Sequence, residues 1–356
     1  MQILHVVGAR PNFMKAAPVY RALAASGHQQ TLVHTGQHYD QKMSAVFFSD
    51  LAIPEPDENL NVGSGSHACQ TAAIMRRFEP VVLERKPDLV LVYGDVNSTL
   101  ATTLVCSKEG IRVGHVEAGL RSFDRTMPEE INRIITDQLA DHLYTPSVDG
   151  NENLAREGIP SEKVFLVGNV MIDTLVRLLP KADTAFENLN SVLGLDEFGL
   201  VTLHRPSNVD DASNFLPMLG VLEELAREIP LVFPVHPRTR SKWAVRLEKS
   251  PGGLHLIDPL GYLDFLALQK HAKLIITDSG GIQEESTYLG VPCFTLRNST
   301  ERPITVSVGT NVLIGNDWEL LRTKCAEVLS GLPPKRDVPP LWDGKASERI
   351  AQILSM

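Results

Sequence analysis

The sequence predicts an α/β protein built from two doubly wound, Rossmann-like domains, whose parallel sheets face each other across a cleft. Three observations lead to this prediction. The chain has 356 residues, which is too long for one typical core and suits two domains. Short apolar runs alternate with helix-like segments along its length. Most of these runs lack polar alternation, which is typical of parallel strands that helices cover on both faces.

The predicted strands fall into two series separated by a weakly patterned stretch at 180–197. The first series contains 3–7, 31–34, 89–93, 111–116, 142–144 and 164–167. The second contains 200–204, 231–235, 254–257, 274–277, 293–296 and 312–314. We therefore expect domains at 1–180 and 181–346. A proline-rich segment at 332–340 precedes a last predicted helix, and we expect 347–356 to pack back on the first domain.

Composition and charge exclude several classes of partner. The net charge is −9 and no long basic run is present, which argues against nucleic acid or an anionic membrane as the main partner. No apolar stretch approaches membrane-spanning length, and the first predicted strand begins at once, without a signal peptide. The four cysteines are scattered without paired spacing, so we expect no metal site. Cys69, Cys106 and Cys293 lie beside apolar or small residues, and we expect them to be buried thiols in a reducing compartment.

The most informative segment is 274–285, where an apolar run ends in Asp278 and a helix-like stretch follows. Ser279, Gly280 and Gly281 form the turn between them. Two residues without Cβ atoms let a ligand approach the backbone, and the start of a helix attracts a phosphate. A carboxylate about one turn further in, Glu285, could accept hydrogen bonds from sugar hydroxyls. The alternative is an ordinary strand-to-helix turn whose glycines serve packing.

Ligands of open α/β sheets bind beyond the carboxyl ends of the strands, and ionisable side chains gather there in both predicted domains. Acids are prominent in the first domain, and histidine and arginine in the second. The residues that follow the predicted strands are Arg10, Gln37, His38, Asp95, Glu117, Arg121, His204, Arg205, His236, Arg238, Asp278 and Arg297.

Arg10 is predicted to bind phosphate, because a planar guanidinium matches phosphate oxygens in a bidentate manner. Lys15 lies about one turn beyond and could join it. His204 could be a core histidine, but the neighbouring Arg205 favours anion binding. His236 and Arg238 form a similar pair. No strand-to-helix turn has the glycine spacing of a dinucleotide fingerprint, so we expect no nicotinamide or flavin cofactor.

Candidate catalytic acids follow two neighbouring strands and begin one helix. Asp95 and Glu117 each follow a strand, and Pro128 precedes the pair Glu129 and Glu130 in the first turn of a predicted helix. The two glutamates could simply complement the helix dipole. Several acids in one site can otherwise divide the roles of general acid and general base.

Eight motifs in this order resemble the non-hydrolysing UDP-N-acetylglucosamine 2-epimerases, and the match covers essentially the whole chain. They are Gly-Ala-Arg-Pro at 8–11, Thr-Gly-Gln-His at 35–38, Gly-Asp at 94–95, His-Val-Glu-Ala-Gly-Leu-Arg at 115–121, Pro-Glu-Glu-Ile-Asn-Arg at 128–133, Thr-Leu-His-Arg at 202–205, Asp-Ser-Gly-Gly-Ile-Gln-Glu-Glu at 278–285 and Thr-Glu-Arg-Pro at 300–303. The resemblance implies the glycosyltransferase-B fold, with the last helix crossing over, and a cytoplasmic homodimer.

The resemblance also implies roles for residues at matching positions. Catalytic roles fall on Asp95, Glu117, Glu129 and His204. Substrate binding falls on Arg10, Lys15, His236, Arg238, Ser279, Gly280, Gly281, Glu285 and Arg302. A second, regulatory UDP-sugar site in some members corresponds to Gln37, His38, Gln70 and Arg205. Two departures put such regulation in doubt here: Asn12 stands where the family often has Glu, and Ser207-Asn208 where it often has Glu-Asn.

The implied reaction is reversible epimerisation at C2 of UDP-N-acetylglucosamine, with loss of UDP to 2-acetamidoglucal and re-addition. The resemblance extends at 33–40 to epimerases of UDP-2,3-diacetamido-glucuronic acid, so that substrate is an alternative. A retaining glycosyltransferase of the same fold is a second alternative, although it gives the acids of the first domain no obvious use. A hydrolysing relative that releases free N-acetylmannosamine is a third. A non-catalytic UDP-sugar sensor gains nothing from three positioned carboxylates.

Overall fold

The protein was analysed as a computed structural model, which describes residues 1–37, 45–247, 250, 252–332 and 337–356. The chain divides into two compact units, Met1–Thr174 with Pro340–Met356 and Leu175–Pro339. The division falls inside helix α7 (Val170–Leu193), so much of the weakly patterned stretch at 180–197 is helical. The boundary thus lies six residues before the expected one, and the C-terminal segment of the first unit begins at Pro340 instead of 347.

Unit 1 contains a seven-stranded sheet in the order β3-β2-β1-β4-β5-β6-β7, with every pair parallel. Its strands are β1 (Gln2–Val7), β2 (Gln29–His34), β3 (Glu58–Asn59), β4 (Leu89–Tyr93), β5 (Val113–Val116), β6 (His142–Thr145) and β7 (Val164–Leu166). Its helices are α1 (Arg10–Ala25), α2 (Ala45–Leu51), α3 (His67–Arg85), α4 (Asn97–Lys108), α5 (Pro128–Leu139), α6 (Val148–Arg156) and α15 (Ala346–Leu354), with the 3-10 turn Ser161–Lys163.

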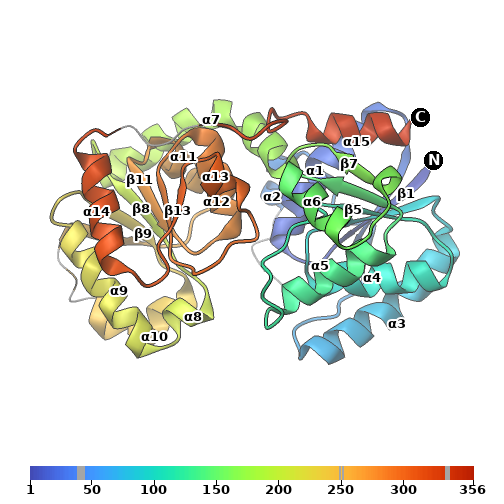
Figure 1. The fold of residues 1–356 in the computed structure, drawn as a ribbon, viewed down its shortest axis with the longest axis horizontal. Coiled ribbons are helices and arrows are strands. Elements are labelled where there is room, and N and C mark those ends of the chain that lie inside the picture. The colour runs from blue at the N-terminus through green and yellow to red at the C-terminus, as the bar shows by residue number, and fades with distance from the viewer. Residues whose placement is uncertain (38–44, 248–249, 251, 333–336) are drawn as a thin grey trace. The chain divides into compact units, whose positions relative to one another are not determined.

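Unit 2 contains a six-stranded sheet in the order β10-β9-β8-β11-β12-β13, again with every pair parallel. Its strands are β8 (Gly199–Thr202), β9 (Leu231–Pro234), β10 (Leu254–Ile257), β11 (Leu274–Thr277), β12 (Cys293–Thr295) and β13 (Asn311–Leu313). Its helices are α8 (Pro206–Val209), α9 (Ala212–Leu225), α10 (Pro237–Leu247), α11 (Tyr262–His271), α12 (Gly280–Leu289), α13 (Ile304–Ser307) and α14 (Trp318–Leu329) (Figure 1).

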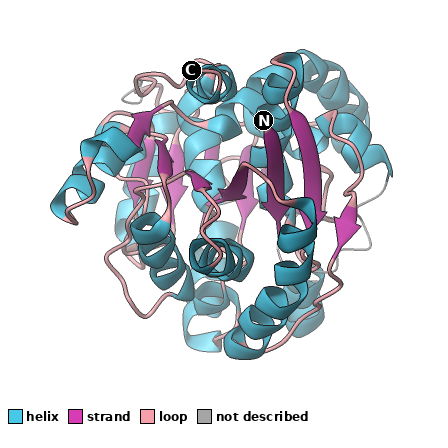
Figure 2. Ribbon diagram, turned by 90° about the vertical axis from the view of Figure 1, so that its right-hand side faces the viewer, coloured by secondary structure: helices cyan, strands magenta, loops and turns pink. Residues whose placement is uncertain are grey.

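The predicted fold class is confirmed: each unit is a parallel sheet flanked by helices, and the strands lie in a row between helices in Figure 2. All twelve predicted strands are present with ends that differ by up to two residues, and the short edge strand β3 was missed. Two residues are too few to show periodicity. The central strands are buried on both faces, as the apolar runs predicted: every residue of β4 and of β11 is buried, whereas β7 and β10 near the sheet edges are mostly half-buried.

The last helix packs within unit 1, where α15 contacts α1. Its start is held by Asp173, whose two carboxylate oxygens accept hydrogen bonds from Ala346 N at 3.1 Å and Ser347 N at 2.7 Å. The indole N–H of Trp342 donates to the carbonyl of Pro146 at 2.8 Å. Hydrogen bonds across about 170 to 200 residues of sequence therefore fasten the C-terminal segment to this unit.

Candidate functional site

Asp95 follows strand β4 and is held by helix α5. Its carboxylate forms an ion pair with Arg133, which is buried and also pairs with Glu130. Its backbone carbonyl accepts a hydrogen bond from Asn132 Nδ2 at 2.8 Å. About a quarter of the Asp95 side chain remains exposed. Asp95 is thus fixed by both its carboxylate and its backbone, while part of its side chain stays exposed.

Glu117 follows strand β5 in a left-handed backbone conformation, with φ 76°. This region is uncommon for residues with a Cβ atom and clusters at functional sites. The carboxylate is buried and forms an ion pair with Lys15 of α1, which is buried too. The structure therefore places the ammonium group of Lys15 beside a candidate catalytic acid.

The two glutamates at the start of α5 differ in their surroundings. Glu130 is buried, and its carboxylate accepts hydrogen bonds from Ser122 N at 2.9 Å, Ser122 Oγ at 3.0 Å and Phe123 N at 2.9 Å. Glu129 is partly exposed, and its carboxylate has no partner among the described residues. Glu130 thus has a structural role, and Glu129 is the glutamate of this pair that is available for chemistry.

A buried network that the sequence did not predict joins the elements that carry the acids. The two ring nitrogens of His115 lie 2.6 Å from Asp137 Oδ1 and 2.8 Å from the carbonyl of Gly94. Asp137 also pairs with Arg121 at 2.7 Å and accepts from Gly119 N at 3.1 Å. Arg121 in turn binds both carboxylate oxygens of Glu157.

Charge compensation stabilises this network. Burial alone would raise the pKa of Asp137, but His115 and Arg121 outweigh it and hold that pKa below its usual value. Burial alone would lower the pKa of Arg121, but Glu157 and Asp137 outweigh it and raise that pKa. Arg121, one of the strand-end residues, is therefore a buried structural cation. His115 stood in a quoted motif, but only the tertiary structure brings it to Gly94 and Asp137.

The β1–α1 turn carries Arg10 as the first residue of α1, partly exposed. Asn12 is buried, and its Oδ1 accepts hydrogen bonds from Gly8 N and Ala9 N, both at 3.0 Å. Its Nδ2 donates to the carbonyl of Tyr93 at 2.8 Å. The asparagine that departs from the family pattern thus braces this turn against the end of β4.

The predicted regulatory residues lie in different surroundings. Gln37 is buried, and its Oε1 accepts from Ser98 N at 2.9 Å and Ser98 Oγ at 2.7 Å. Gln70 is buried and donates to the carbonyls of Gln37 at 3.0 Å and Gly63 at 2.9 Å. His38 lies outside the described residues. Arg205 belongs to unit 2, where its Nε donates to the carbonyl of Asp278 at 3.0 Å.

In unit 2 a short turn joins β11 to α12, as predicted, and Ser279 is the residue that immediately precedes the helix. A Cβ added at Gly280 would lie 2.5 Å from Arg302 Nη1 and 2.7 Å from Glu301 Oε1. A Cβ added at Gly281 would meet no described atom within 4 Å. A side chain at Gly280 would therefore have to displace the ends of the Arg302 and Glu301 side chains, whereas the missing side chain at Gly281 leaves its backbone open to a ligand.

His204 lies beside this turn and is oriented by Asp278. Its Nδ1 is 3.0 Å from Asp278 Oδ1, and half of its side chain is exposed. The buried carboxylate of Asp278 also accepts from Arg205 N and Asn208 Nδ2, both at 3.0 Å. Burial would raise the pKa of Asp278, but these contacts outweigh it and lower that pKa. Asp278 was quoted in the motif without a role, and in the structure it holds the end of β8 and the start of α8 together.

Glu285 lies in the second turn of α12 and is fully buried. Its two carboxylate oxygens accept hydrogen bonds from Tyr262 Oη and from Gln269 Nε2, both at 2.7 Å. Burial raises the pKa of Glu285, and these two donors offset part of the shift. The two donors fix the orientation of the carboxylate, and each oxygen retains capacity to accept one more hydrogen bond.

Arg302 lies against Gly280 and is compensated by two acids, Glu284 and Glu301. Its Nε is 2.9 Å from Glu284 Oε1, and Glu301 also pairs with Arg297 at 2.7 Å. This cluster of ion pairs packs against Gly280, so Arg302 contributes to the structure of the turn. His236 is exposed just after β9, and the Arg238 side chain lies outside the described residues.

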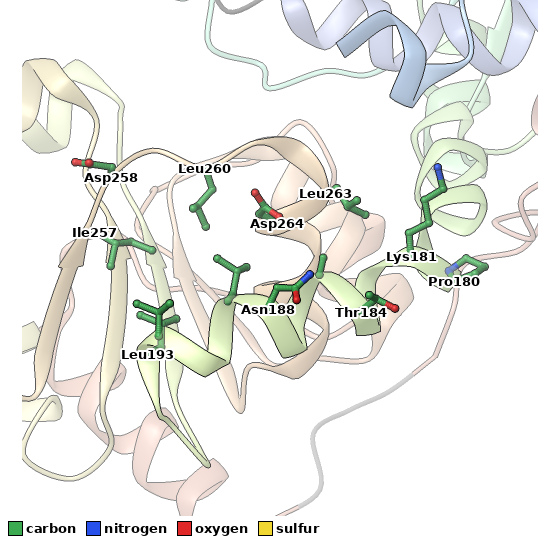
Figure 3. Close-up of a pocket in the computed structure, with 13 residues that line it drawn as sticks. Pro180, Lys181, Thr184, Asn188, Leu193, Ile257, Asp258, Leu260, Leu263 and Asp264 are labelled. Atoms are coloured by element: carbon green, nitrogen blue, oxygen red, sulfur yellow. The ribbon is translucent and has the colours of Figure 1, made fainter. Parts of the chain in front are cut away.

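A pocket of about 820 Å³ lies elsewhere in unit 2, between α7 and the segment that joins β10 to α11 (Figure 3). Its lining is largely apolar and includes Leu193, Ile257 and Leu260. None of the candidate site residues lines it.

Within the described ranges, no group of three or more His, Cys, Asp or Glu side chains is placed to hold a metal ion. The helices of those ranges also lack the length and apolar character that crossing a bilayer requires.

Comparison with known proteins agrees with this arrangement. The family model described as UDP-N-acetylglucosamine 2-epimerase matches residues 21–355. The UDP-N-acetylglucosamine 2-epimerase of Methanocaldococcus jannaschii is 44% identical over 370 residues, covering 100% of this chain and 99% of its own. The UDP-2,3-diacetamido-2,3-dideoxy-D-glucuronate 2-epimerase of Pseudomonas aeruginosa is 41% identical over 368 residues, with coverage of 100% and 99%.

A solved structure supports both the family and the fold. The crystal structure of the Methanocaldococcus jannaschii enzyme in complex with UDP-GlcNAc and UDP has a TM-score of 0.91 at 43% identity, and it covers 100% of this chain and 99% of its own. The resemblance found in the motifs is thereby confirmed over the full length. The chain belongs to the UDP-N-acetylglucosamine 2-epimerase family.

Proposed function

We propose that the protein catalyses reversible epimerisation at C2 of UDP-N-acetylglucosamine, giving UDP-N-acetylmannosamine. The observation that carries this proposal is the placement of the candidate acids in unit 1 and of the open glycine turn in unit 2. Unit 1 presents Asp95, Glu117 and Glu129 after strands and at a helix start, and unit 2 presents an open glycine turn at the start of α12. Family membership supplies the substrate class.

The chemistry of the substrate selects an elimination. The hydrogen on C2 is not next to a carbonyl, so direct deprotonation would give an unstabilised carbanion. Instead, a base takes the C2 proton, the C–H electrons form the C1–C2 double bond, and the C1–O electrons leave with UDP. The intermediate is 2-acetamidoglucal. Delivery of a proton to the other face of C2 and re-addition of the UDP oxygen at C1 complete the exchange.

Two faces of C2 require two proton-transfer groups, which several acids in one unit can provide. Asp95 and Glu117 are each paired with a cation, Arg133 and Lys15. Glu129 has no partner among the described residues and is the third candidate.

Departure of UDP places negative charge on the diphosphate, and preorganised donors lower its cost. We propose that the backbone at Ser279, Gly280 and Gly281 holds the diphosphate with His204, while Glu285 accepts the ribose hydroxyls. The positive end of the ten-residue helix α12 reinforces binding of the anion. Arg10, His236 and Arg238 are proposed as further contacts of the substrate.

The related glucuronate substrate is a second candidate, because the Pseudomonas aeruginosa relative is almost as similar as the Methanocaldococcus jannaschii enzyme. The two sugars differ at C3 and C6, not in the bonds that react. Parallel assays with both UDP-sugars at equal concentration decide between them by the ratio of kcat/KM.

The deciding experiment is incubation with UDP-N-acetylglucosamine alone in deuterated water, followed by proton NMR. The expected product is UDP-N-acetylmannosamine with deuterium at C2, formed without an added cofactor. Retention of the original hydrogen at C2 would exclude the elimination. Free N-acetylmannosamine would indicate a hydrolysing enzyme, and turnover only with an added sugar acceptor would indicate a glycosyltransferase.

We also propose that the protein is a cytoplasmic homodimer, as the family resemblance implies. The chain mass is 39.2 kDa, so light scattering on the purified protein should give about twice that value. A mass of one chain at working concentration would contradict the dimer.

A further inference from the structure

Three carboxamide side chains form a hydrogen-bonded chain that crosses three helices of unit 1 and ends at Asp95. Gln70 of α3, Asn97 of α4 and Asn132 of α5 are all at least nine-tenths buried. Asn97 Nδ2 donates to Gln70 Oε1 at 2.8 Å, and Asn132 Nδ2 donates to Asn97 Oδ1 at 3.2 Å. Asn132 Nδ2 also donates to the carbonyl of Asp95 at 2.8 Å.

The direction of this chain is fixed at both ends by backbone carbonyls, which can only accept. Gln70 Nε2 faces the carbonyls of Gln37 and Gly63, so its oxygen must face Asn97. The amide nitrogen of Asn97 therefore faces Gln70, and its oxygen faces Asn132. The nitrogen of Asn132 is left to donate to Asp95. Only this set of amide orientations satisfies every link, which makes the chain a defined polar network.

The carbonyl that terminates the chain belongs to a residue whose side chain is partly exposed and ion-paired. Asp95 is therefore located from two directions, with Arg133 holding its carboxylate and Asn132 its backbone. The preceding carbonyl, that of Gly94, is held by His115 at 2.8 Å. Proton transfer requires the acid to lie within about 0.5 Å of its productive position. A shift of about 1 Å in a catalytic group can cost about 10²-fold in rate.

We propose that Asn132 is a positioning residue for Asp95 and that Asn97 and Gln70 hold Asn132 in the orientation that donates to the Asp95 carbonyl. This inference rests on the proposed role of Asp95 as a catalytic acid. It assigns Asn132 no contact with the substrate. The chain also joins the segment of Gln37, a predicted regulatory residue, to Asp95 through an unbroken series of hydrogen bonds.

The test uses neutral substitutions of similar size, because a new charge near Asp95 would itself alter the chemistry. Asn132→Leu removes both donated hydrogen bonds and should lower kcat by about 10²-fold, with KM and UDP affinity nearly unchanged. Asn97→Leu leaves the bond from Asn132 to Asp95 in place and should lower kcat by about 10-fold or less. Asn132→Ala is the second variant if leucine is not accommodated.

A matched control comes from α4, the helix of Asn97. Thr103 is buried, and in the described part of the chain its hydroxyl donates only to the carbonyl of Thr99, within the same helix, at 2.8 Å. Thr103→Val should leave kcat unchanged. Thermal unfolding followed by circular dichroism reports the folded fraction of each variant, because the substitutions lie in unit 1 and a UDP titration would report on the proposed nucleotide residues of unit 2. Normalising kcat to that fraction removes losses that come from unfolding alone.

A double-mutant cycle decides whether Asn132 acts through Asp95. In the Asp95→Asn background, Asn132→Leu should lower the residual rate by less than about 3-fold. Multiplication of the two losses would overturn the inference, as would a kcat of Asn132→Leu equal to that of Thr103→Val. If Asp95→Asn turned over at the parental rate, the inference would fail while the proposed epimerisation stood. Absence of epimerisation by the parental protein would overturn the proposed function instead.

Discussion

The ammonium group of Lys15 and the carboxylate of Glu117 form a buried ion pair, although 101 residues separate them in the chain. Glu117 adopts a left-handed backbone conformation at this point, with φ 76°. The sequence suggested a phosphate contact for Lys15, because it lies one turn beyond Arg10. The ion pair gives Lys15 a second role, in fixing a candidate acid, and the two roles predict different losses.

Lys15→Met should destabilise the protein by about 3–5 kcal/mol, because it leaves a buried carboxylate without its cation. The urea midpoint measures this loss. Lys273→Met is the matched control: Lys273 pairs with Glu197 at the surface, where such pairs contribute about 0–1 kcal/mol. UDP affinity should be unchanged in both variants. An unchanged midpoint with weakened UDP binding would make Lys15 a phosphate ligand instead.

Asp95→Asn, Glu117→Gln and Glu129→Gln should each lower kcat by about 10²–10⁴-fold, the usual contribution of a proton-transfer group. UDP binding should stay close to parental, because the proposed nucleotide residues lie in unit 2. Kinetics at saturating substrate and calorimetry with UDP separate the two effects. Glu130→Gln should differ by losing stability, since Glu130 accepts two backbone N–H bonds. A variant with normal turnover and lost UDP affinity would move that residue to binding.

UDP affinity should fall in acid through Glu285. Burial raises the pKa of Glu285, so its carboxylate takes up a proton at a higher pH than an exposed glutamate does. The ionised form accepts ribose hydroxyls, and its loss or removal typically costs about 1.5–3 kcal/mol. Glu285→Gln should bind UDP more weakly at neutral pH and lack this pH dependence. Calorimetry of both proteins in a pH series that descends from neutral toward about pH 4, the usual pKa of an exposed glutamate, measures this difference, and the comparison cancels the titration of UDP itself.

The same pKa shift predicts a stability effect of opposite sign. Because the folded pKa of Glu285 lies above the unfolded value, the native state binds this proton more tightly. The contribution is present below the unfolded pKa and is lost as pH rises through the folded pKa. Without UDP, Glu285→Gln should therefore show a smaller decline in stability than the parent across that window. Equal declines would show that Glu285 is not the group responsible.

Gly281→Val and Gly280→Val should separate ligand approach from packing. A side chain at Gly281 meets no described atom within 4 Å, so this variant should fold normally and lose UDP binding. A side chain at Gly280 would collide with Arg302 and Glu301, so that variant should lose stability as well. Thermal unfolding and calorimetry measure the two properties. Normal UDP affinity in Gly281→Val would leave the turn with a structural role only.

Asp278→Asn should cost about 1.5–3 kcal/mol, because an amide nitrogen would face donors that the carboxylate now accepts. Asp211→Asn is the control, since Asp211 caps α9 at the surface and asparagine caps equally well. The pKa of Asp278 is lowered, so its contribution is present above the unfolded pKa and is lost as pH falls through the folded pKa. The free energies of unfolding of the two variants should therefore differ at neutral pH and become similar in strong acid.

The order of apolar runs determined much of the fold, because strands buried on both faces cannot alternate with polar residues. It also determined where candidate residues lie, since parallel strands present their carboxyl ends at one edge. Asp95, Glu117 and Asp278 were located in this way. The strand β3 was not, because two residues carry no periodicity. Helix α7 was not either, since the weak pattern around Pro180 suggested a boundary where the chain continues as helix.

Only the tertiary structure decided which groups these residues contact. Lys15 with Glu117, His115 with Asp137, and Glu285 with Tyr262 are pairs whose members lie on different elements. Glu129 and Glu130 are neighbours in sequence, yet one is partly exposed and the other buried among donors. The carboxamide chain from Gln70 to Asp95 likewise depends on how three helices pack. Sequence patterns report which face of an element is buried, whereas the partner of a polar group depends on rotamers and distances between elements that no local pattern encodes.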